Sequence, residues 1–178
     1  MNGAAAVCIH ATCLELSSGE LSIGLLFRGP SGSGKSMLAL RLLDEVGTGL
    51  ASDGVPPVTA RLVSDDQVLL RPADSSLLAS APAAISGLIE VRGVGIVQVP
   101  CVTAQTRLGL VIDHVPSAAI DRMPPQARAG LCGIDLPLHH LDFARPDTPA
   151  RVRVLARIAW EQLQLASDSL PQYLAARR

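Results

Sequence analysis

Eight residues, 29–36, have the residue types and spacing of a phosphate-binding loop, because they fit the pattern G-x-x-x-x-G-K-[ST]. In such a loop the glycines let backbone N–H groups surround an anion, the lysine reaches the outer phosphates, and the last hydroxyl is offered to Mg²⁺. Apolar residues 25–27 lead into the stretch and residues 37–46 read as a helix, which is the required order of strand, loop and helix. A Gly/Ser-rich linker with a chance lysine would not have this context. We therefore expect ATP to bind at Gly29, Pro30, Ser31, Gly32, Ser33, Gly34, Lys35 and Ser36.

Two adjacent carboxylates, Asp65 and Asp66, follow a short predicted strand at residues 61–64. A carboxylate at a strand end downstream of a phosphate loop is where such proteins order Mg²⁺. Because successive strand side chains point to opposite faces, one carboxylate can face the metal while the other faces a phosphoryl acceptor. A solvated turn would also place two aspartates together.

A third acidic residue, Glu90, lies in the apolar segment 87–97, with Arg92 two positions later. In an extended segment these two side chains share one face. A buried acid and base would need partners, and Mg²⁺-ATP would be a natural one. An edge strand with a surface ion pair would show the same pattern.

A histidine, His10, is predicted to lie near the phosphate loop. Residues 7–16 and 21–27 read as two strands joined by a turn, so they should pair as a hairpin. The second strand runs into the loop, and His10 lies at the end of the first strand that is far from the turn. His10 is therefore a candidate active-site residue, although a strand histidine bonded to a backbone group would fit the same pattern.

The composition narrows the class of protein. A length of 178 residues with 48% apolar and 2% aromatic residues predicts one domain, residues 1–178, whose core is aliphatic. A net charge of −1 argues against nucleic-acid and anionic-membrane partners. The first ten residues lack a basic region and no apolar run approaches ~18 residues, so we expect no signal peptide, no membrane span and a cytoplasmic location. The cysteines, which lack C-x-x-C spacing, are predicted to be reduced thiols: Cys8, Cys13, Cys101 and Cys132.

The other elements are predicted from periodicity and turn residues. Residues 67–71 and 76–81 predict a second hairpin, residues 107–115 a strand buried on both faces, and residues 135–141 a last strand. Residues 47–60 and 116–133 read as loops. Thr148 as N-cap, with Pro149 after it, opens a long helix. The core stripes of the two predicted helices are Leu38, Ala39, Leu42, Leu43 and Val46, and Val152, Leu155, Ala159, Leu163 and Ala166.

Three segments in this order, the phosphate loop, residues 61–66 and residues 88–96, resemble the bacterial HPr kinase/phosphorylase family. The last segment is that family's own signature, and the resemblance is good over residues 8 to 115 and weak beyond them. It implies a short form comprising only the catalytic domain. The implied fold is α/β: a P-loop nucleotide-binding domain with a mixed β-sheet related to phosphoenolpyruvate carboxykinase, here with a C-terminal helix. The implied reaction is ATP-dependent phosphorylation of a serine on the phosphocarrier protein HPr, with phosphorolysis of that phosphoserine in many members.

The resemblance also implies roles for individual residues. Asp66 would take the serine proton and return it in the reverse direction, and Lys35 would hold the outer phosphates. Ser36 and Glu90 would bind Mg²⁺, for which Asp65 is a further candidate. The remaining catalytic candidates are His10 and Arg122. HPr is the expected partner, and a homo-oligomer is expected.

The sequence departs from the family at three points. Met37 replaces the usual acidic residue after the loop, and residues 47–60 are longer than the family's link. A late Pro-x-Gly-Arg-Asn segment tied to phosphorolysis has no clear counterpart, residues 149–153 being the nearest. Of the two activities that the resemblance implies, kinase activity is therefore better supported than phosphorolysis.

Two other classes of function stay open. A small-molecule kinase would also use a phosphate loop and a downstream acid, but its usual arginine-rich lid is not evident. A non-catalytic ATP sensor would need fewer carboxylates than this chain carries.

Overall fold

The computed structural model describes residues 5–47 and 55–166, with side chains described as far as residue 163. The strands are β1 (Val7–His10), β2 (Thr12–Ser18), β3 (Leu21–Arg28), β4 (Thr59–Ser64), β5 (Gln67–Ala73), β6 (Ser76–Ser80), β7 (Leu88–Val91), β8 (Gly95–Gln98), β9 (Thr106–His114), β10 (Ala127–Leu131) and β11 (Ile134–Leu141). The helices are α1 (Lys35–Asp44) and α2 (Thr148–Ala166), with short 3₁₀ turns at Ala83–Ile85 and Ser117–Ala119.

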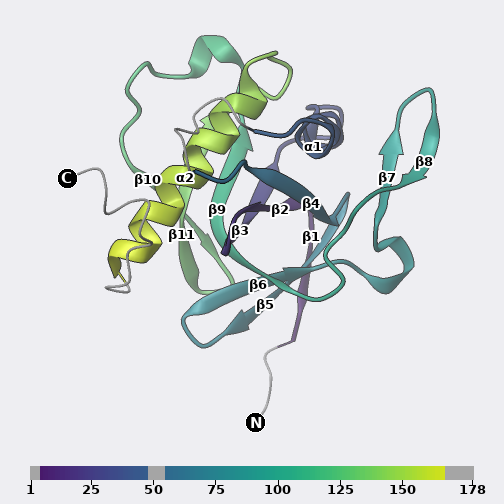
Figure 1. Ribbon diagram of the computed structural model, residues 1–178, viewed down its shortest axis with the longest axis horizontal. Coiled ribbons are helices and arrows are strands. Elements are labelled where there is room, and N and C mark those ends of the chain that lie inside the picture. The colour runs from purple at the N-terminus through teal and green to yellow at the C-terminus, as the bar shows by residue number, and fades with distance from the viewer. Residues whose placement is uncertain (1–4, 48–54, 167–178) are drawn as a thin grey trace.

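Within the described residues, nine strands form one mixed sheet whose main order is β1-β5-β6-β9-β3-β2-β4 (Figure 1). β9 is parallel to β3 on one side. On its other side it is antiparallel to β6 along its first half and parallel to β11 along its second half. β10 extends this side by pairing with β11. The hairpin of β7 and β8 is a separate two-stranded sheet that projects from the rest of the fold. The predicted mixed sheet with a C-terminal helix is thus confirmed.

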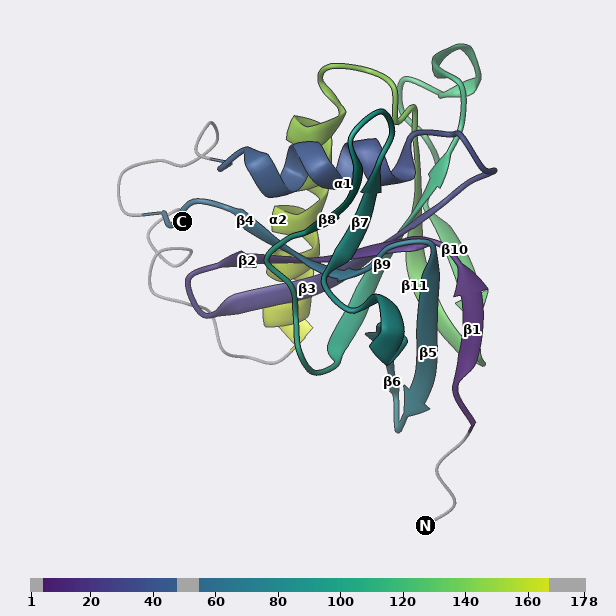
Figure 2. The same ribbon diagram turned by 90° about the vertical axis from the view of Figure 1, so that its right-hand side faces the viewer.

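The core has two parts, one on each face of the sheet. Both helices cover one face, where α1 and α2 pack on alternate residues of β2, β3 and β9 (Figure 2). The other face is covered by the strands themselves, because the sheet curls and brings β5, β6, β10 and β11 around a second cluster. Leu25 and Phe27 belong to the first cluster and Leu26 to the second, which explains the continuous apolar run before the phosphate loop.

The first predicted strand is divided in two. β2 pairs with β3 from Thr12 to Ser18, as the predicted hairpin requires, but β1 leaves this pair and instead pairs with β5. Ala11, which lies at the break, donates its backbone N–H to Asp66 O at 3.3 Å. The prediction of one strand over residues 7–16 was therefore wrong, and His10 reaches the site from a different strand.

Both helices differ from prediction at their ends. α1 begins at Lys35, and Val46 is 58% exposed beyond its last residue, Asp44, so Val46 is not part of the core stripe. In α2, Leu163 is 39% exposed, while the buried Trp160 packs in the core instead. Ala166 lies beyond the described side chains.

The start of α2 also differs by one residue. Arg151 N donates to Asp147 O, which makes Asp147 the N-cap. Thr148, the predicted N-cap, turns its hydroxyl back to Asp142 O at 2.6 Å.

Two further comparisons with the sequence concern β10 and Glu90. The segment 116–133 was predicted as a loop but contains β10, whose Ala127–Leu131 sequence is weak in strand-forming residues. The sequence left open whether Glu90 is buried or lies on a surface edge strand; it lies on the exposed face of β7, while Ile89 is 1% exposed on the other. Of the predicted loop 47–60, residues 48–54 lie outside the described part, and Gly47 pairs with Val58 across them.

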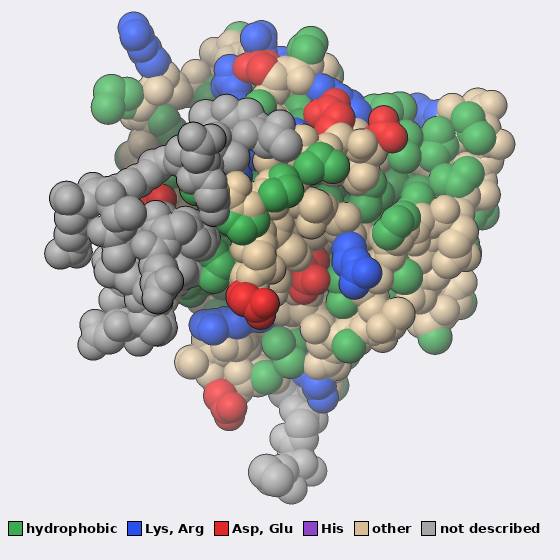
Figure 3. Space-filling view, in the orientation of Figure 1, with side chains coloured by type: hydrophobic (Ala, Val, Ile, Leu, Met, Phe, Trp, Pro, Cys, Tyr) green, Lys and Arg blue, Asp and Glu red, His purple; other side chains and the backbone are tan. Residues whose placement is uncertain are grey.

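The charged surface and the thiols can be described for the same residues. The described residues include no helix that is both long and apolar enough to cross a bilayer. Blue and red side chains are interspersed on the face seen in Figure 3 rather than gathered by sign. All four cysteines are free, and burial raises the pKa of the Cys13 thiol above its ordinary range.

Candidate active site

The phosphate loop joins the end of β3 to the start of α1. Gly32 and Gly34 have φ angles of 80° and 93°, a region that side chains with a Cβ rarely adopt. The loop folds on itself through Ser33 N, which donates to Pro30 O at 3.2 Å. These turns direct the chain into α1, whose first backbone N–H groups have no intrahelical partner and favour an anion.

A pocket of about 230 Å³ opens at the start of α1. Its lining comes from the phosphate loop, the ends of β1 and β4, and the projecting hairpin: His10, Ser31, Gly32, Gly34, Lys35, Ser36, Met37, Asp65, Asp66, Glu90 and Arg92. The structure thus brings nearly all of the predicted site residues together. Gly29, Pro30 and Ser33 belong to the same loop but do not line the pocket. Arg122 lies apart, in the exposed segment before β10.

Lys35 is folded against its own loop. The side chain is 6% exposed, and Nζ donates to Gly29 O at 2.9 Å and to Pro30 O at 3.1 Å. Nζ also lies 3.1 Å from His10 Nε2. Burial lowers the pKa of Lys35 from its ordinary value of 10.5, and the charges of Asp66 and Asp65 partly oppose this effect. Bound phosphates would offer this ammonium stronger acceptors than the loop carbonyls do.

His10 connects Lys35 to the second carboxylate. Its Nδ1 lies 3.1 Å from the backbone oxygen of Asp66 and 3.5 Å from Asp66 Oδ1. A carbonyl oxygen can only accept, so Nδ1 carries the proton, and in a neutral imidazole Nε2 is then the acceptor for Lys35. The position of His10 follows from the pairing of β1 with β5, where His10 lies opposite Gln67.

Asp65 and Asp66 point to different surroundings. Asp65 is 6% exposed, and its Oδ1 accepts hydrogen bonds from Ser36 Oγ at 3.0 Å and from Thr12 Oγ1 at 2.6 Å. Asp66 has a φ of 67°, and its side chain is 70% exposed. The left-handed turn at Asp66 therefore leaves one carboxylate on the phosphate loop and the other open to an incoming molecule.

The oxygen donors of this pocket suit Mg²⁺. The ion typically takes one or two protein carboxylates and completes its shell with phosphate and water, so Ser36 and Asp65 with a nucleotide would suffice. Glu90 lines the same pocket from β7 and could bind the ion directly or through water. The described residues contain no group of three or more His, Cys, Asp or Glu that could hold a metal by themselves.

A wall of residues behind the phosphate loop supports its shape. A Cβ on Gly29 would lie 2.8 Å from His114 Cβ, and one on Gly34 would lie 3.5 Å from Phe143 Cβ. Phe143 packs edge-on against Phe27, with ring centroids 5.9 Å apart. The loop therefore has little room for larger side chains on this side.

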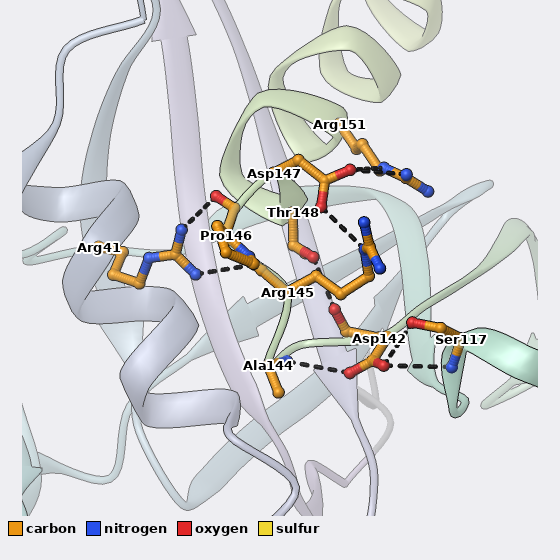
Figure 4. A network of polar contacts seen from close by, with 9 residues as sticks. All are labelled: Arg41, Ser117, Asp142, Ala144, Arg145, Pro146, Asp147, Thr148 and Arg151. Atoms are coloured by element: carbon orange, nitrogen blue, oxygen red, sulfur yellow. Dashed lines mark hydrogen bonds and ion pairs between the residues drawn. The ribbon is translucent and has the colours of Figure 1, made fainter.

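Polar contacts connect the segment between β11 and α2 to α1 and to the start of α2 (Figure 4). Arg41 of α1 donates to the backbone oxygens of Arg145 and Pro146 just before α2. Asp142 accepts from both the hydroxyl and the N–H of Ser117, and the Ser117 hydroxyl is the main cause of its lowered pKa. These contacts fix the start of α2 beside α1.

No pattern in the sequence marked Thr12 as a site residue. Its contact with Asp65 spans 53 positions and depends on the pairing of β2 with β4, in which Cys13 lies opposite Ser64. Arg92 was noted beside Glu90, but no ion pair joins these two side chains in the described residues.

Comparison with known proteins identifies the family of this chain. Residues 3–123 match the family described as HPr Serine kinase C-terminal domain. This chain belongs to that family. The matched residues include the phosphate loop, both aspartates and the β7–β8 hairpin.

Several members of the HPr serine kinase family are similar to the chain. The HPr kinase/phosphorylase of Clostridium botulinum is 35% identical over 91 residues, which cover 51% of this chain and 24% of that protein. The HPr kinase/phosphorylase of Lactobacillus acidophilus is 31% identical over 140 residues, or 72% of this chain and 38% of that protein. The matches thus span about a quarter to two fifths of these relatives.

A solved structure supports the fold over nearly the whole chain. The Hpr(Ser) kinase/phosphatase from Coxiella burnetii superposes with a TM-score of 0.68 and 25% identity. The superposition covers 90% of this chain and 99% of the other.

Proposed function

We propose that this protein transfers the γ-phosphoryl group of Mg²⁺-ATP to a serine hydroxyl of an HPr-type phosphocarrier protein. The observation that carries the proposal is that two neighbouring carboxylates lie in different surroundings. Asp65 is turned inward onto Ser36 of the phosphate loop, and Asp66 is turned outward beside His10. A nucleotide-binding protein without chemistry has no need of the second, exposed carboxylate.

Several polar side chains of the pocket would take part in this reaction. Lys35 and the N–H groups at the start of α1 would hold the phosphates, and Ser36, Asp65 and Glu90 would hold Mg²⁺. The bound ion neutralises charge on the phosphate oxygens. Asp66 would accept the serine proton while the new O–P bond forms and the bond to ADP breaks. The neutral His10 would keep its Nδ1–H on the Asp66 carbonyl and so fix the direction of that residue.

The relatives are named HPr kinase/phosphorylase, and this name suggests that the chain could also catalyse the reverse reaction. In that direction inorganic phosphate would attack phosphoserine, and Asp66 would return the proton to the serine oxygen. The forward reaction is the one that we propose, because the family's late motif has no clear counterpart, residues 149–153 in the first turns of α2 being the nearest. A homo-oligomer remains a prediction.

The direct test is incubation of the purified protein with [γ-³²P]ATP, Mg²⁺ and HPr from the same organism. We expect label on HPr, recovered as phosphoserine, and none when Mg²⁺ is chelated. Transfer to a small metabolite instead would make the protein a small-molecule kinase. ATP binding without transfer to either would make it an ATP sensor.

Glu90→Gln is expected to raise the Mg²⁺ concentration needed for half-maximal transfer by about 10-fold, with the fold unchanged. The reason is that Mg²⁺ prefers carboxylate oxygen, and Glu90 lies on the exposed face of β7, opposite the buried Ile89, so the change leaves the core untouched. Glu161→Gln, an exposed change on α2 outside the pocket, is the matched control. Equal Mg²⁺ dependence in wild type and Glu90→Gln would remove Glu90 from the metal site.

A further inference from the structure

Thr12 is a buried residue at the start of β2 whose hydroxyl faces the proposed metal site. Its relative exposure is 0%, and Oγ1 donates to Asp65 Oδ1 at 2.6 Å. We infer that Thr12 is a positioning residue that orients Asp65, and through it Ser36, toward bound Mg²⁺. This inference rests on the proposed Mg²⁺-ATP site.

The contact gathers three elements at one carboxylate oxygen. Thr12 begins β2, Asp65 follows β4, and Ser36 lies in the first turn of α1. Both hydroxyls donate to Oδ1, at 2.6 Å and 3.0 Å. The terminal torsion of an aspartate is broad, so one donor alone would leave the carboxylate free to rotate. Two donors from different elements on one oxygen fix its plane and leave Oδ2 for a metal ion or its water.

The orientation of Ser36 depends on the same oxygen. A serine hydroxyl has one proton and two lone pairs. Because its proton is given to Asp65, the lone pairs of Ser36 Oγ stay available for a cation in the pocket. A rotated Asp65 would no longer accept this proton, so the hydroxyl of Ser36 would lose the contact that holds its lone pairs toward the ion. Thr12 thus acts on the metal through two other side chains and does not itself line the pocket.

The test is calorimetric titration of a non-hydrolysable ATP analogue with and without Mg²⁺. Thr12→Val keeps the shape but removes the donor, and we expect the gain in affinity due to Mg²⁺ to fall by about 10-fold. Affinity without Mg²⁺ should stay near the wild-type value, since the phosphate loop is unchanged. Thr12→Ser, which keeps the hydroxyl, should retain the wild-type gain.

Thr106→Val is a matched control for loss of a buried threonine donor. Thr106 is 4% exposed and donates to Glu15 Oε2 at 2.5 Å, outside the pocket. We expect this variant to lose stability but to keep the full effect of Mg²⁺ on nucleotide affinity.

Several outcomes would overturn the inference. One is an equal loss of affinity with and without Mg²⁺ in Thr12→Val, and another is a loss in Thr12→Ser as large as in Thr12→Val. If Thr12→Val does not fold, Thr12→Ala takes its place beside Thr12→Ser in the same titrations. A wild type whose affinity does not respond to Mg²⁺ refutes the metal site and the role of Thr12 together. If the Thr12 variants bind nucleotide as expected but the wild type transfers no phosphoryl group to HPr, only the kinase proposal is refuted.

Discussion

Asp66→Asn should slow phosphoryl transfer to HPr by ~10²–10⁴-fold while nucleotide binding stays nearly normal, which is the size of effect typical of a lost general base. A serine hydroxyl is a poor nucleophile until its proton can leave, and asparagine has the size of aspartate but cannot take that proton at neutral pH. The Asp66 side chain is 70% exposed and its ion-pair partner His10 is 50% exposed, so the change should cost little stability. Single-turnover kinetics and ATP titration of the same preparation would separate the two effects.

Asp65→Asn is the matched variant, since it makes the same chemical change one residue earlier. Asp65 is buried and accepts from Thr12 and Ser36, so its loss should disturb Mg²⁺-dependent binding or stability instead. Normal turnover in Asp66→Asn with lost turnover in Asp65→Asn would mean that the two roles are reversed. If neither variant is slow, the kinase proposal is wrong.

Lys35→Met is expected to weaken ATP binding by about 100-fold, because charge-assisted hydrogen bonds to phosphate are worth about 3 kcal/mol at a desolvated site. The protein should remain folded, since the ammonium is buried against loop carbonyls and its pKa is already lowered by burial. Calorimetry gives the affinity and thermal unfolding gives the stability. Unchanged ATP affinity would contradict the assignment of the phosphate loop.

Lys35 is also the only lysine in the sequence, so ¹³C-lysine labelling yields one side-chain signal. Its titration midpoint in the free protein should lie below the ordinary value of 10.5. Bound ATP should raise the pKa, because the phosphates add negative charge next to the ammonium. A midpoint at or above 10.5 without nucleotide would show that Lys35 is more solvated than the structure indicates.

The sequence by itself determined the parts of the site that lie close together along the chain. The phosphate loop needs a strand before it, a helix after it and glycines at left-handed positions, and all of these fall within residues 25–46. Asp65 and Asp66 were found directly after a strand and were expected to point apart, although the left-handed φ of Asp66 in the turn to β5, and not alternation along the strand, separates them. The family assignment followed from the same local segments.

Tertiary structure decided the contacts between segments far apart in the chain. His10 meets Asp66, which lies 56 positions later, because β1 pairs with β5, whereas the predicted hairpin would have kept His10 on the strand beside β3. The sequence left open whether Glu90 is buried or exposed, since an apolar segment does not reveal which of its faces will meet a partner. Thr12 carried no signal at all, because its role depends on the register between β2 and β4.

The same limit explains the errors at the ends of elements. Periodicity gives the inward face of a helix but not the point where its partner ends, so Val46 and Leu163 were wrongly placed in the core. β10, with the sequence Ala-Arg-Ala-Gly-Leu, has little strand propensity and is held in place by pairing with β11. Local propensity amounts to a few tenths of a kcal/mol per residue, and the free energy of packing and strand pairing outweighs it.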